Sequence, residues 1–149
     1  MPLDVRLLDG AFLPGEALDS FAASHPDAGG IASFVGKVRP DDSVEMLELS
    51  HYAPLTLPGM EALAERTMER WPLEGILILH RTGTMQPGDP IVLVAAAARH
   101  RRDAFEAADF AMDHLKSDAW FWKREKRADG WHWIEPSPQD HADLARWVG

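Results

Sequence analysis

Gly75-Ile76-Leu77-Ile78-Leu79-His80 is a strongly apolar run in the middle of this 149-residue chain. The turn sequence Gln86-Pro87-Gly88-Asp89-Pro90 follows it and leads into a second apolar run, from Ile91 to Ala98. Short, continuously apolar segments between turn residues are typical of strands that are buried on both faces. The two runs therefore predict two buried strands, either in the interior of the domain or at the face of a dimer.

Outside these runs the sequence predicts hairpins. The β-like segment from Ile31 to Arg39 is followed by turn residues and then by a returning strand over 44–52. Two strand-like segments joined by a short turn are typical of a hairpin, so we expect one over 31–52. Further strands are expected over 3–8, 120–125 and 131–134, the last two paired as a second hairpin.

Two amphipathic helices are also expected. Over 58–71, apolar residues recur at i, i+3, i+4, i+7, i+8 and i+11, with Pro58 in the first turn and Pro72 at the end. A second helix begins near Asp103, and its expected buried stripe is Phe105, Ala108, Met112 and Leu115. Helices mixed with hairpin-connected strands favour a single α+β domain over 1–149. Residues 136–149 are expected to form a flexible tail with a short helical turn around Leu144 and Trp147.

The composition limits the classes of function. The net charge of -9 argues against a general nucleic-acid binder, which needs a basic face for the phosphates. The sequence has no cysteine, which excludes disulfides, thiolate metal sites and a cysteine nucleophile. No apolar run approaches the roughly 18 residues of a membrane span. Because the first residues lack a signal-peptide pattern, we expect a cytoplasmic protein.

Cationic residues gather at a few places despite the acidic background. Lys37 and Arg39 are two apart, so a strand directs both to one face. His100-Arg101-Arg102 precedes a helix, whose N-terminus favours anions. Lys116 lies at the far end of that helix, and Lys123-Arg124 lies on the next strand. If these groups converge in the fold, they can bind a phosphate or a carboxylate. If they lie apart, each is a solvated surface residue. The spacing alone leaves both possibilities open.

Other kinds of site are disfavoured. The seven histidines form no H-x-H or H-x-x-x-H pair, so we expect no metal site. His51 and His80, each on an apolar strand, are expected in the core. The sequence contains no phosphate-binding loop, dinucleotide fingerprint or nucleophile elbow, and no cofactor is expected.

A series of short motifs lies in order between Gly29 and Glu135. The motifs are Phe34-Val35-Gly36-Lys37-Val38-Arg39, Trp71-Pro72-Leu73, His80-Arg81-Thr82-Gly83, Pro87-Gly88-Asp89, His100-Arg101, Ala104-Phe105-Glu106-Ala107, Met112-Asp113-His114-Leu115-Lys116 and Phe121-Trp122-Lys123-Arg124-Glu125. Their order and spacing resemble the large, catalytic subunit of molybdopterin synthase, the MoaE family. Trp120 departs from that pattern, because the family commonly has proline there.

The resemblance implies a sulfurtransferase with an α+β fold of the α/β-hammerhead type. In this family a small ubiquitin-like partner subunit (MoaD-like) carries a thiocarboxylate on its C-terminal Gly-Gly tail, which enters a pocket of the large subunit. Sulfur then passes twice to cyclic pyranopterin monophosphate, giving the dithiolene of molybdopterin in molybdenum cofactor biosynthesis. Two large subunits pair as a dimer at the centre of a heterotetramer.

The same resemblance implies the site residues. Lys116 and Lys123 stand at the positions of the family's essential lysines and are the expected catalytic residues. Lys116 is expected to polarise the thiocarboxylate or to transfer protons. Lys123 is expected to act as a second acid/base or as an electrostatic clamp oriented by Glu125. The residues expected to line the substrate pocket are Lys37, Val38, Arg39, His100, Arg101, Lys116, Lys123, Arg124 and Glu125.

Within that pocket, Arg39, His100 and Arg101 are expected to hold the phosphate. Two other functions remain open at this level. The chain could be a non-catalytic module that binds a ubiquitin-like C-terminal tail, or an unrelated enzyme of a phosphorylated metabolite that uses the same cations.

Overall fold

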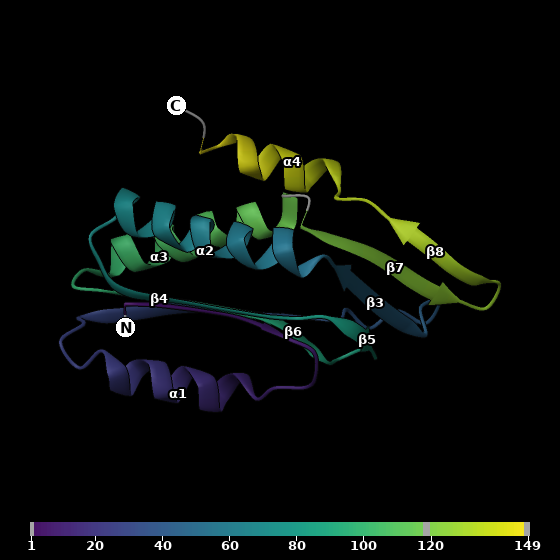
Figure 1. The fold of residues 1–149 in the computed structure, drawn as a ribbon, viewed down its shortest axis with the longest axis horizontal. Coiled ribbons are helices and arrows are strands. Elements are labelled where there is room, and N and C mark those ends of the chain that lie inside the picture. The colour runs from purple at the N-terminus through teal and green to yellow at the C-terminus, as the bar shows by residue number, and fades with distance from the viewer. Residues whose placement is uncertain (1, 118–119, 148–149) are drawn as a thin grey trace.

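The computed structural model describes residues 2–117 and 120–147. Four helices and two four-stranded sheets form this part of the chain (Figure 1). The helices are α1 (Pro14–Ser24), α2 (Ala53–Arg70), α3 (Arg101–Ser117) and α4 (Pro138–Ala145). The strands are β1 (Leu3–Leu8), β2 (Gly30–Lys37), β3 (Met46–His51), β4 (Leu73–Arg81), β5 (Gly83–Met85), β6 (Pro90–Ala98), β7 (Phe121–Arg127) and β8 (Gly130–Ile134).

The two apolar runs form the middle strands of the first sheet, whose order is β1-β4-β6-β2. Helices α2 and α3 cover one face of this sheet and α1 covers the other (Figure 1). In β6, Ala96 and Ala98 pack towards α3, whereas Ala95 and Ala97 pack towards α1. The prediction of two buried strands is confirmed, and both strands lie inside the domain because helices cover them on both sides.

The second sheet has the order β5-β3-β7-β8 and lies at one end of the first (Figure 1). Leu47 and Leu49 of β3 are buried in a small cluster with Val38 and Met85. The hairpin predicted from 120–125 and 131–134 is confirmed as β7 and β8, and Gly130 at its turn has a φ of 122°, which favours glycine.

The hairpin predicted over 31–52 is wrong. Strand β2 pairs antiparallel with β6, whereas β3 pairs with β5 and β7. After β2 the Val38 N–H donates to the Asp89 carbonyl oxygen and the Val38 carbonyl accepts from Gly88 N–H, so the chain stays beside the β6 region before it crosses to the second sheet. An alternating pattern shows that a strand has a buried face, but the partner strand depends on which long-range pairing buries more surface.

Helix α2 begins at Ala53, earlier than the predicted helix over 58–71. Pro54 lies in the first turn, where a backbone N–H has no partner within the helix, so the proline costs little there. The Tyr52 carbonyl accepts from Thr56 N–H at 2.8 Å and closes this early turn. Pro58 therefore lies inside the helix, not at its start, and its missing N–H would have faced the Pro54 carbonyl.

The start of α2 is tied to the start of β7. The fully buried Thr56 donates through Oγ1 to the Trp120 carbonyl oxygen at 2.6 Å. A Cβ added to Gly59 would lie 2.4 Å from the Trp120 indole Nε1, so only glycine lets the tryptophan pack this closely. These contacts set where the strand that carries Lys123 begins.

Helix α3 buries Ala108, Met112 and Leu115 as predicted, but not Phe105. The side facing the sheet consists of Ala104, Ala107, Ala108, Ala111, Met112 and Leu115, and Phe105 is 63% exposed beside it. Small alanine side chains on both α3 and β6 let the helix approach the sheet closely, which is why the large Phe105 lies off the interface.

Helix α1 was not predicted, and α4 was predicted only as a short helical turn around Leu144 and Trp147. The sequence predicts a flexible tail over 136–149, whereas the structure forms α4 within it over Pro138–Ala145, and 148–149 lie outside the described residues. The Ser137 side chain accepts from Asp140 N–H while the Asp140 carboxylate accepts from Ser137 N–H, which is a capping box. Helix α4 packs on α3, and Trp147 beyond its end contacts Trp71 and Phe110. The described residues form a single α+β domain.

Candidate active site

Lys116, Lys123 and Arg39 lie close together where α3, β7 and the end of β2 meet. The positive charges of Lys116 and Arg39 both lower the pKa of Lys123, an influence that is screened beyond about 8 Å in physiological salt. Lys116 is exposed in the last turn of α3, and Arg39 is exposed just after β2. Three of the cations predicted to share a site therefore converge from three distant segments.

The register of β7 directs Lys123 and Glu125 to one face of the second sheet. Lys123 lies opposite Leu49 of β3, and Glu125 lies opposite Leu47. Directly paired residues of an antiparallel ladder point to the same face, and both leucines are buried in the cluster between the sheets. Lys123 thus has its charge at the margin of an apolar face and is half-buried.

Burial is the largest cause that lowers the pKa of Lys123 below its usual range, and the charge of Lys116 is the next. The carboxylates of Glu125 and Asp140 act in the opposite direction, and Arg39 adds a smaller lowering. A lysine that releases its proton at a lower pH than an exposed lysine is suited to general acid–base work.

An aromatic pair, His80 and Phe121, lies beside the lysines. The two rings are stacked at 4.0 Å between centroids, with 19° between their planes. Burial, together with a smaller effect of the Lys116 charge, lowers the pKa of His80 to about 4, although the hydrogen bond with the Arg81 carbonyl acts in the opposite direction. His80 is therefore neutral near neutral pH, and Nδ1, 2.9 Å from the Arg81 carbonyl oxygen, donates to it. His80 is buried as predicted, whereas His51 is exposed.

A pocket of about 350 Å³ opens beside Lys116, between β2, α3 and α4. Asp140 and Asp143 of α4 line it, and Asp140 also acts on Lys123. Prediction from the sequence missed this contribution because 136–149 was expected to be a tail. The Ser137-x-x-Asp140 spacing is the signal that could have revealed a helix there. The lining residues are Ala32, Ser33, Phe34, Phe105, Ala108, Asp109, Met112, Asp113, Lys116, Asp140 and Asp143.

Arg124 lies on the face of β7 opposite to Lys123, because successive strand residues alternate. Its guanidinium donates to both carboxylate oxygens of Glu48, at 2.8 Å and 3.0 Å, and lies 4.3 Å from the centroid of the Trp131 ring. The Glu125 carboxylate accepts from Arg127 at 2.9 Å. Arg124 and Glu125 were both predicted to line the pocket. The structure places Glu125 on the same face as Lys123, whereas Arg124 binds Glu48 on the other face of β7.

Val38 and Lys37 differ in their surroundings. Val38 is 4% exposed and packs in the cluster between the two sheets, where it supports the chain that carries Arg39. Lys37 is the last residue of β2 and is exposed. The side chain of Val38 therefore belongs to the core, and that of Lys37 is exposed to solvent at the end of β2.

His100 and Arg101 lie at the opposite end of α3 from Lys116. Arg101 is the first residue of α3, and 15 residues of helix at about 1.5 Å each separate it from Lys116 by roughly 22 Å. Both are exposed. Within one chain the structure does not bring them to the lysines.

Neither a metal centre nor a membrane span is formed by residues 2–117 and 120–147. In these segments no group of three or more His, Cys, Asp or Glu side chains is arranged to hold a metal ion. No helix among them is both long enough and apolar enough to cross a bilayer.

Comparison with known proteins gives a consistent result. Residues 11–118 match the family described as MoaE protein. The molybdopterin synthase catalytic subunit of Caulobacter vibrioides is 42% identical over 144 residues, which are 96% of each chain. The molybdopterin cofactor biosynthesis protein E from Burkholderia multivorans has a similar structure, with a TM-score of 0.84 and 39% identity over 99% of this chain and 97% of that one.

A more distant structure shares the fold alone. It is the complex of subunits 1 and 2 of molybdopterin-converting factor from Helicobacter pylori, with a TM-score of 0.75 and 20% identity over 91% of each chain. With the family matched over 11–118 and a relative aligned over nearly its whole length, this chain belongs to the MoaE protein family.

Proposed function

We propose that this chain is the catalytic subunit of a molybdopterin synthase, a sulfurtransferase of molybdenum cofactor biosynthesis. It takes sulfur from the thiocarboxylated C-terminus of a small ubiquitin-like partner subunit and transfers it to cyclic pyranopterin monophosphate, forming the dithiolene. The observation that carries the proposal is the convergence of Lys116, Lys123 and Arg39 beside a pocket. The names of the relatives at about 40% identity agree with it.

The three cations suit the proposed substrates. Arg39 can hold two phosphate oxygens at once, because a guanidinium presents its N–H groups as a fork. Lys116 is exposed and can stabilise the negative charge of a thiocarboxylate that approaches from solvent. Lys123 has a lowered pKa and is the group that takes or gives a proton as sulfur changes partner.

The absence of cysteine from the sequence supports delivery of sulfur by another chain. A sulfurtransferase that carries sulfur on itself commonly needs a thiolate. In this chain the sulfur has to arrive already activated, and a thiocarboxylate on a partner's tail meets that need. A cytoplasmic location is part of the same proposal.

His100 and Arg101 enter the proposal through a second copy of the chain. Strand β2 is at the edge of the first sheet, with one side unpaired in the described residues. The start of β2 adjoins Arg101, since a Cβ on Gly30 would lie 3.7 Å from the Arg101 Cα. Two β2 strands paired antiparallel about a two-fold axis bring the start of one beside the end of the other.

Such a pairing carries His100 and Arg101 of the second copy towards Arg39 of the first. The exposed Phe34 of β2 and Phe105 of α3 supply apolar surface on the same side. We propose that each site of the dimer combines the two lysines and Arg39 from one copy with His100 and Arg101 from the other.

The test is sulfur transfer by purified protein with a thiocarboxylated partner subunit and the pterin precursor. We expect Lys116→Ala and Lys123→Ala each to lose activity by about 100-fold or more, the range for removal of a general acid or base. Lys126→Ala is the matched control, because Lys126 lies on the other face of β7 beside Glu45 and should keep full activity.

The same mixture separates the alternatives. Dithiolene product supports the proposed enzyme, whereas a stable complex without product identifies a binding module for a ubiquitin-like tail. Neither complex nor product points to another enzyme of a phosphorylated metabolite. Full turnover by both lysine variants would contradict the assignment of the site.

A further inference from the structure

The pocket beside Lys116 is lined by several carboxylates, although the proposed substrate is an anion. Two of them, Asp109 and Asp113 of α3, already have a cation as a partner. The Arg146 guanidinium donates to Asp109 at 3.2 Å and to Asp113 at 2.6 Å. These two carboxylates therefore hold the end of α4 on α3, and their charge is neutralised within the chain.

The other carboxylates of the pocket, Asp140 and Asp143, come from α4 and are half-buried. In the described part of the chain no Lys, Arg or His forms an ion pair with either of them. Asp140 accepts from the Ser137 N–H in the capping box, and its charge acts on Lys123. Asp143 accepts through Oδ1 from the amide of the exposed Gln139, at 2.7 Å. Asp143 therefore keeps most of its capacity as an acceptor for a ligand in the pocket.

Helix α4 is fastened to α3 at both of its ends, which fixes the place of Asp143. Near the start of α4, the Ser117 Oγ donates to the Asp140 carbonyl oxygen at 3.0 Å. Beyond its end, the Trp147 indole N–H donates to Asp113 at 2.6 Å. Since the last turn of α3 meets the first turn of α4, the two helices run in opposite directions. Asp143 therefore lies about 4.5 Å farther than Asp140 from the lysine end of α3.

Aromatic and apolar side chains form other walls of the pocket. Phe34 of β2 and Phe105 of α3 are 45% and 63% exposed, and both line it together with the buried Met112. Exposed aromatic rings are surfaces on which a planar heterocycle can stack. The volume of about 350 Å³ lies within the range of roughly 300–1,000 Å³ found for small-molecule sites. The pocket thus combines a cationic end, apolar walls and a carboxylate with no cation beside it.

These three kinds of surface match the parts of a pyranopterin. The proposed substrate carries its phosphate at one end and a 2-amino-4-oxopyrimidine ring at the other, and the carbons that accept sulfur lie between them. Arg39 and the lysines suit the phosphate end. The pyrimidine end is uncharged and presents two parallel N–H donors, one at ring N3 and one on the 2-amino group. A carboxylate accepts both at once, one with each oxygen.

We propose, on the basis of the function proposed above, that Asp143 binds the 2-amino-4-oxopyrimidine edge of the pterin substrate and selects for its 2-amino group. The carboxylate accepts from N3–H and from the 2-amino group, and the rings lie beside Phe34 and Phe105. The phosphate then faces Arg39, and the sulfur-accepting carbons lie near the lysines. Asp143 is in this way a residue of substrate specificity that also sets how far the pterin enters the pocket.

The probes are pterin-6-carboxylate and lumazine-6-carboxylate, with binding measured by isothermal titration calorimetry. The two ligands have the same ring system and the same carboxylate, but lumazine has a carbonyl oxygen where pterin has the 2-amino group. The Asp143 carboxylate accepts from the amino group and repels the carbonyl oxygen. We therefore expect the wild-type protein to bind the pterin at least about tenfold more tightly than the lumazine.

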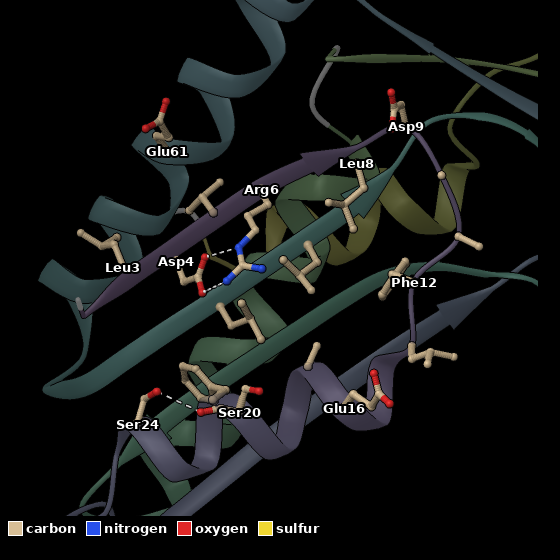
Figure 2. A pocket seen from close by; sticks show the side chains of 18 of the residues that line it. Leu3, Asp4, Arg6, Leu8, Asp9, Phe12, Glu16, Ser20, Ser24 and Glu61 are labelled. Carbon is tan, nitrogen blue, oxygen red and sulfur yellow. Dashed lines mark hydrogen bonds and ion pairs between the residues drawn. The ribbon is translucent and has the colours of Figure 1, made fainter.

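Two variants locate this preference. Asp143→Asn offers one acceptor and one donor, which match N3–H and the carbonyl oxygen of lumazine, so the preference for pterin should fall by about tenfold or more. The matched control is Glu16→Gln, which removes one exposed carboxylate from the largest groove of the domain. That groove, of about 1080 Å³, lies beside α1 on the other face of the first sheet and is lined by different residues (Figure 2). Glu16→Gln should keep the preference of the wild type.

Thermal unfolding checks that each variant is folded, and the wild-type preference is a test that needs no variant. Equal binding of the two ligands by the wild type, an unchanged preference in folded Asp143→Asn, or an equal loss in Glu16→Gln would each overturn the proposal. Binding of these ligands requires neither the partner subunit nor turnover. Dithiolene formation without a preference for pterin would therefore contradict the role of Asp143 alone, whereas a preference for pterin without dithiolene formation would contradict the proposed sulfur transfer.

Discussion

Lys123 and Lys116 are both lysines of the same site, yet their surroundings differ. Lys116 is exposed at a helix end, where a cation is favoured by the helix dipole. Lys123 lies half-buried beside an apolar face, and burial together with the charge of Lys116 lowers its pKa. In the proposed site, Lys123 is therefore the residue suited to proton transfer, and Lys116 is the residue suited to charge stabilisation.

This difference predicts how one lysine responds to the other. Lys116→Ala removes a positive charge that lowers the pKa of Lys123, so that pKa should rise towards the ordinary value. Asp140→Asn removes a negative charge that raises it, so the pKa of Lys123 should fall. Titration of isotope-labelled lysine side chains by NMR measures both shifts. Movement of the two variants in the same direction would be inconsistent with the described cluster.

His80 predicts a dependence of stability on pH. Its pKa is about 4 in the folded protein, against 6.5 for the exposed ring, so the unfolded chain binds more protons between these values. The free energy of unfolding is therefore highest above about pH 6.5, where His80 is neutral in both states. It falls by roughly 3 kcal/mol as the pH falls towards 4, because the unfolded chain then binds a proton that the folded protein does not. Urea unfolding of wild type and His80→Gln across this range measures it. We expect the advantage of the wild type to shrink towards pH 4, and a constant difference would exclude a buried, neutral His80.

At the scale of elements, the contact between α2 and the start of β7 positions the strand that carries Lys123. Thr56 bonds to the Trp120 carbonyl, and Gly59 lies against the Trp120 ring. The tryptophan occupies a position where the MoaE family commonly has proline. The tryptophan ring is larger than a proline ring and packs against α2 where Gly59 has no Cβ. Gly59 and Trp120 therefore form a matched pair.

The pair predicts opposite effects of the same substitution at two helical glycines. Gly59→Ala places a Cβ 2.4 Å from Trp120 Nε1 and should destabilise the protein by about 1–3 kcal/mol, despite the better helix propensity of alanine. Gly15→Ala in α1 meets nothing within 4 Å and should be neutral or stabilise by up to about 1 kcal/mol. Denaturant midpoints measure both. Equal effects at the two positions would show that Trp120 does not pack against α2.

At the scale of the whole molecule, the roughly 22 Å between Arg101 and Lys116 determines how a complete site can form. One chain holds the lysines and Arg39 at one end of α3 and holds His100 and Arg101 at the other. The proposed two-fold dimer through β2 would resolve this separation, because each copy would place one end of its α3 beside the lysines of the other.

The dimer predicts complementation between two inactive chains. Lys116→Ala and Arg101→Ala proteins should each be nearly inactive, and a mixed dimer should contain one intact site and one doubly altered site. After random mixing, half of the dimers are mixed and half of their sites are intact, so about a quarter of wild-type activity should return. Co-expression with two affinity tags and a sulfur-transfer assay measures it. No recovery would mean that both residues act within one chain.

Elements of the fold that depend on local interactions were predicted from the sequence, whereas those that depend on long-range contacts were not. The buried strands around 75–80 and 91–98 and the hairpin of β7 and β8 were predicted because apolar runs and turn residues act locally. Helix α4 was predicted only as a short turn, because its segment is held by contacts with α3 as much as by its own pattern. The 31–52 hairpin was wrong because β2 and β3 find their partners in segments far along the chain.

The sequence by itself determined the family, the absence of thiol chemistry and the identity of the cations, since composition and ordered motifs need no coordinates. Only the tertiary structure decided which cations meet. It brings Lys116, Lys123 and Arg39 together, turns Arg124 to Glu48 and holds Arg101 at the far end of α3. The physical reason is that strand register and helix length set the direction and distance of a side chain, and both are fixed by long-range packing.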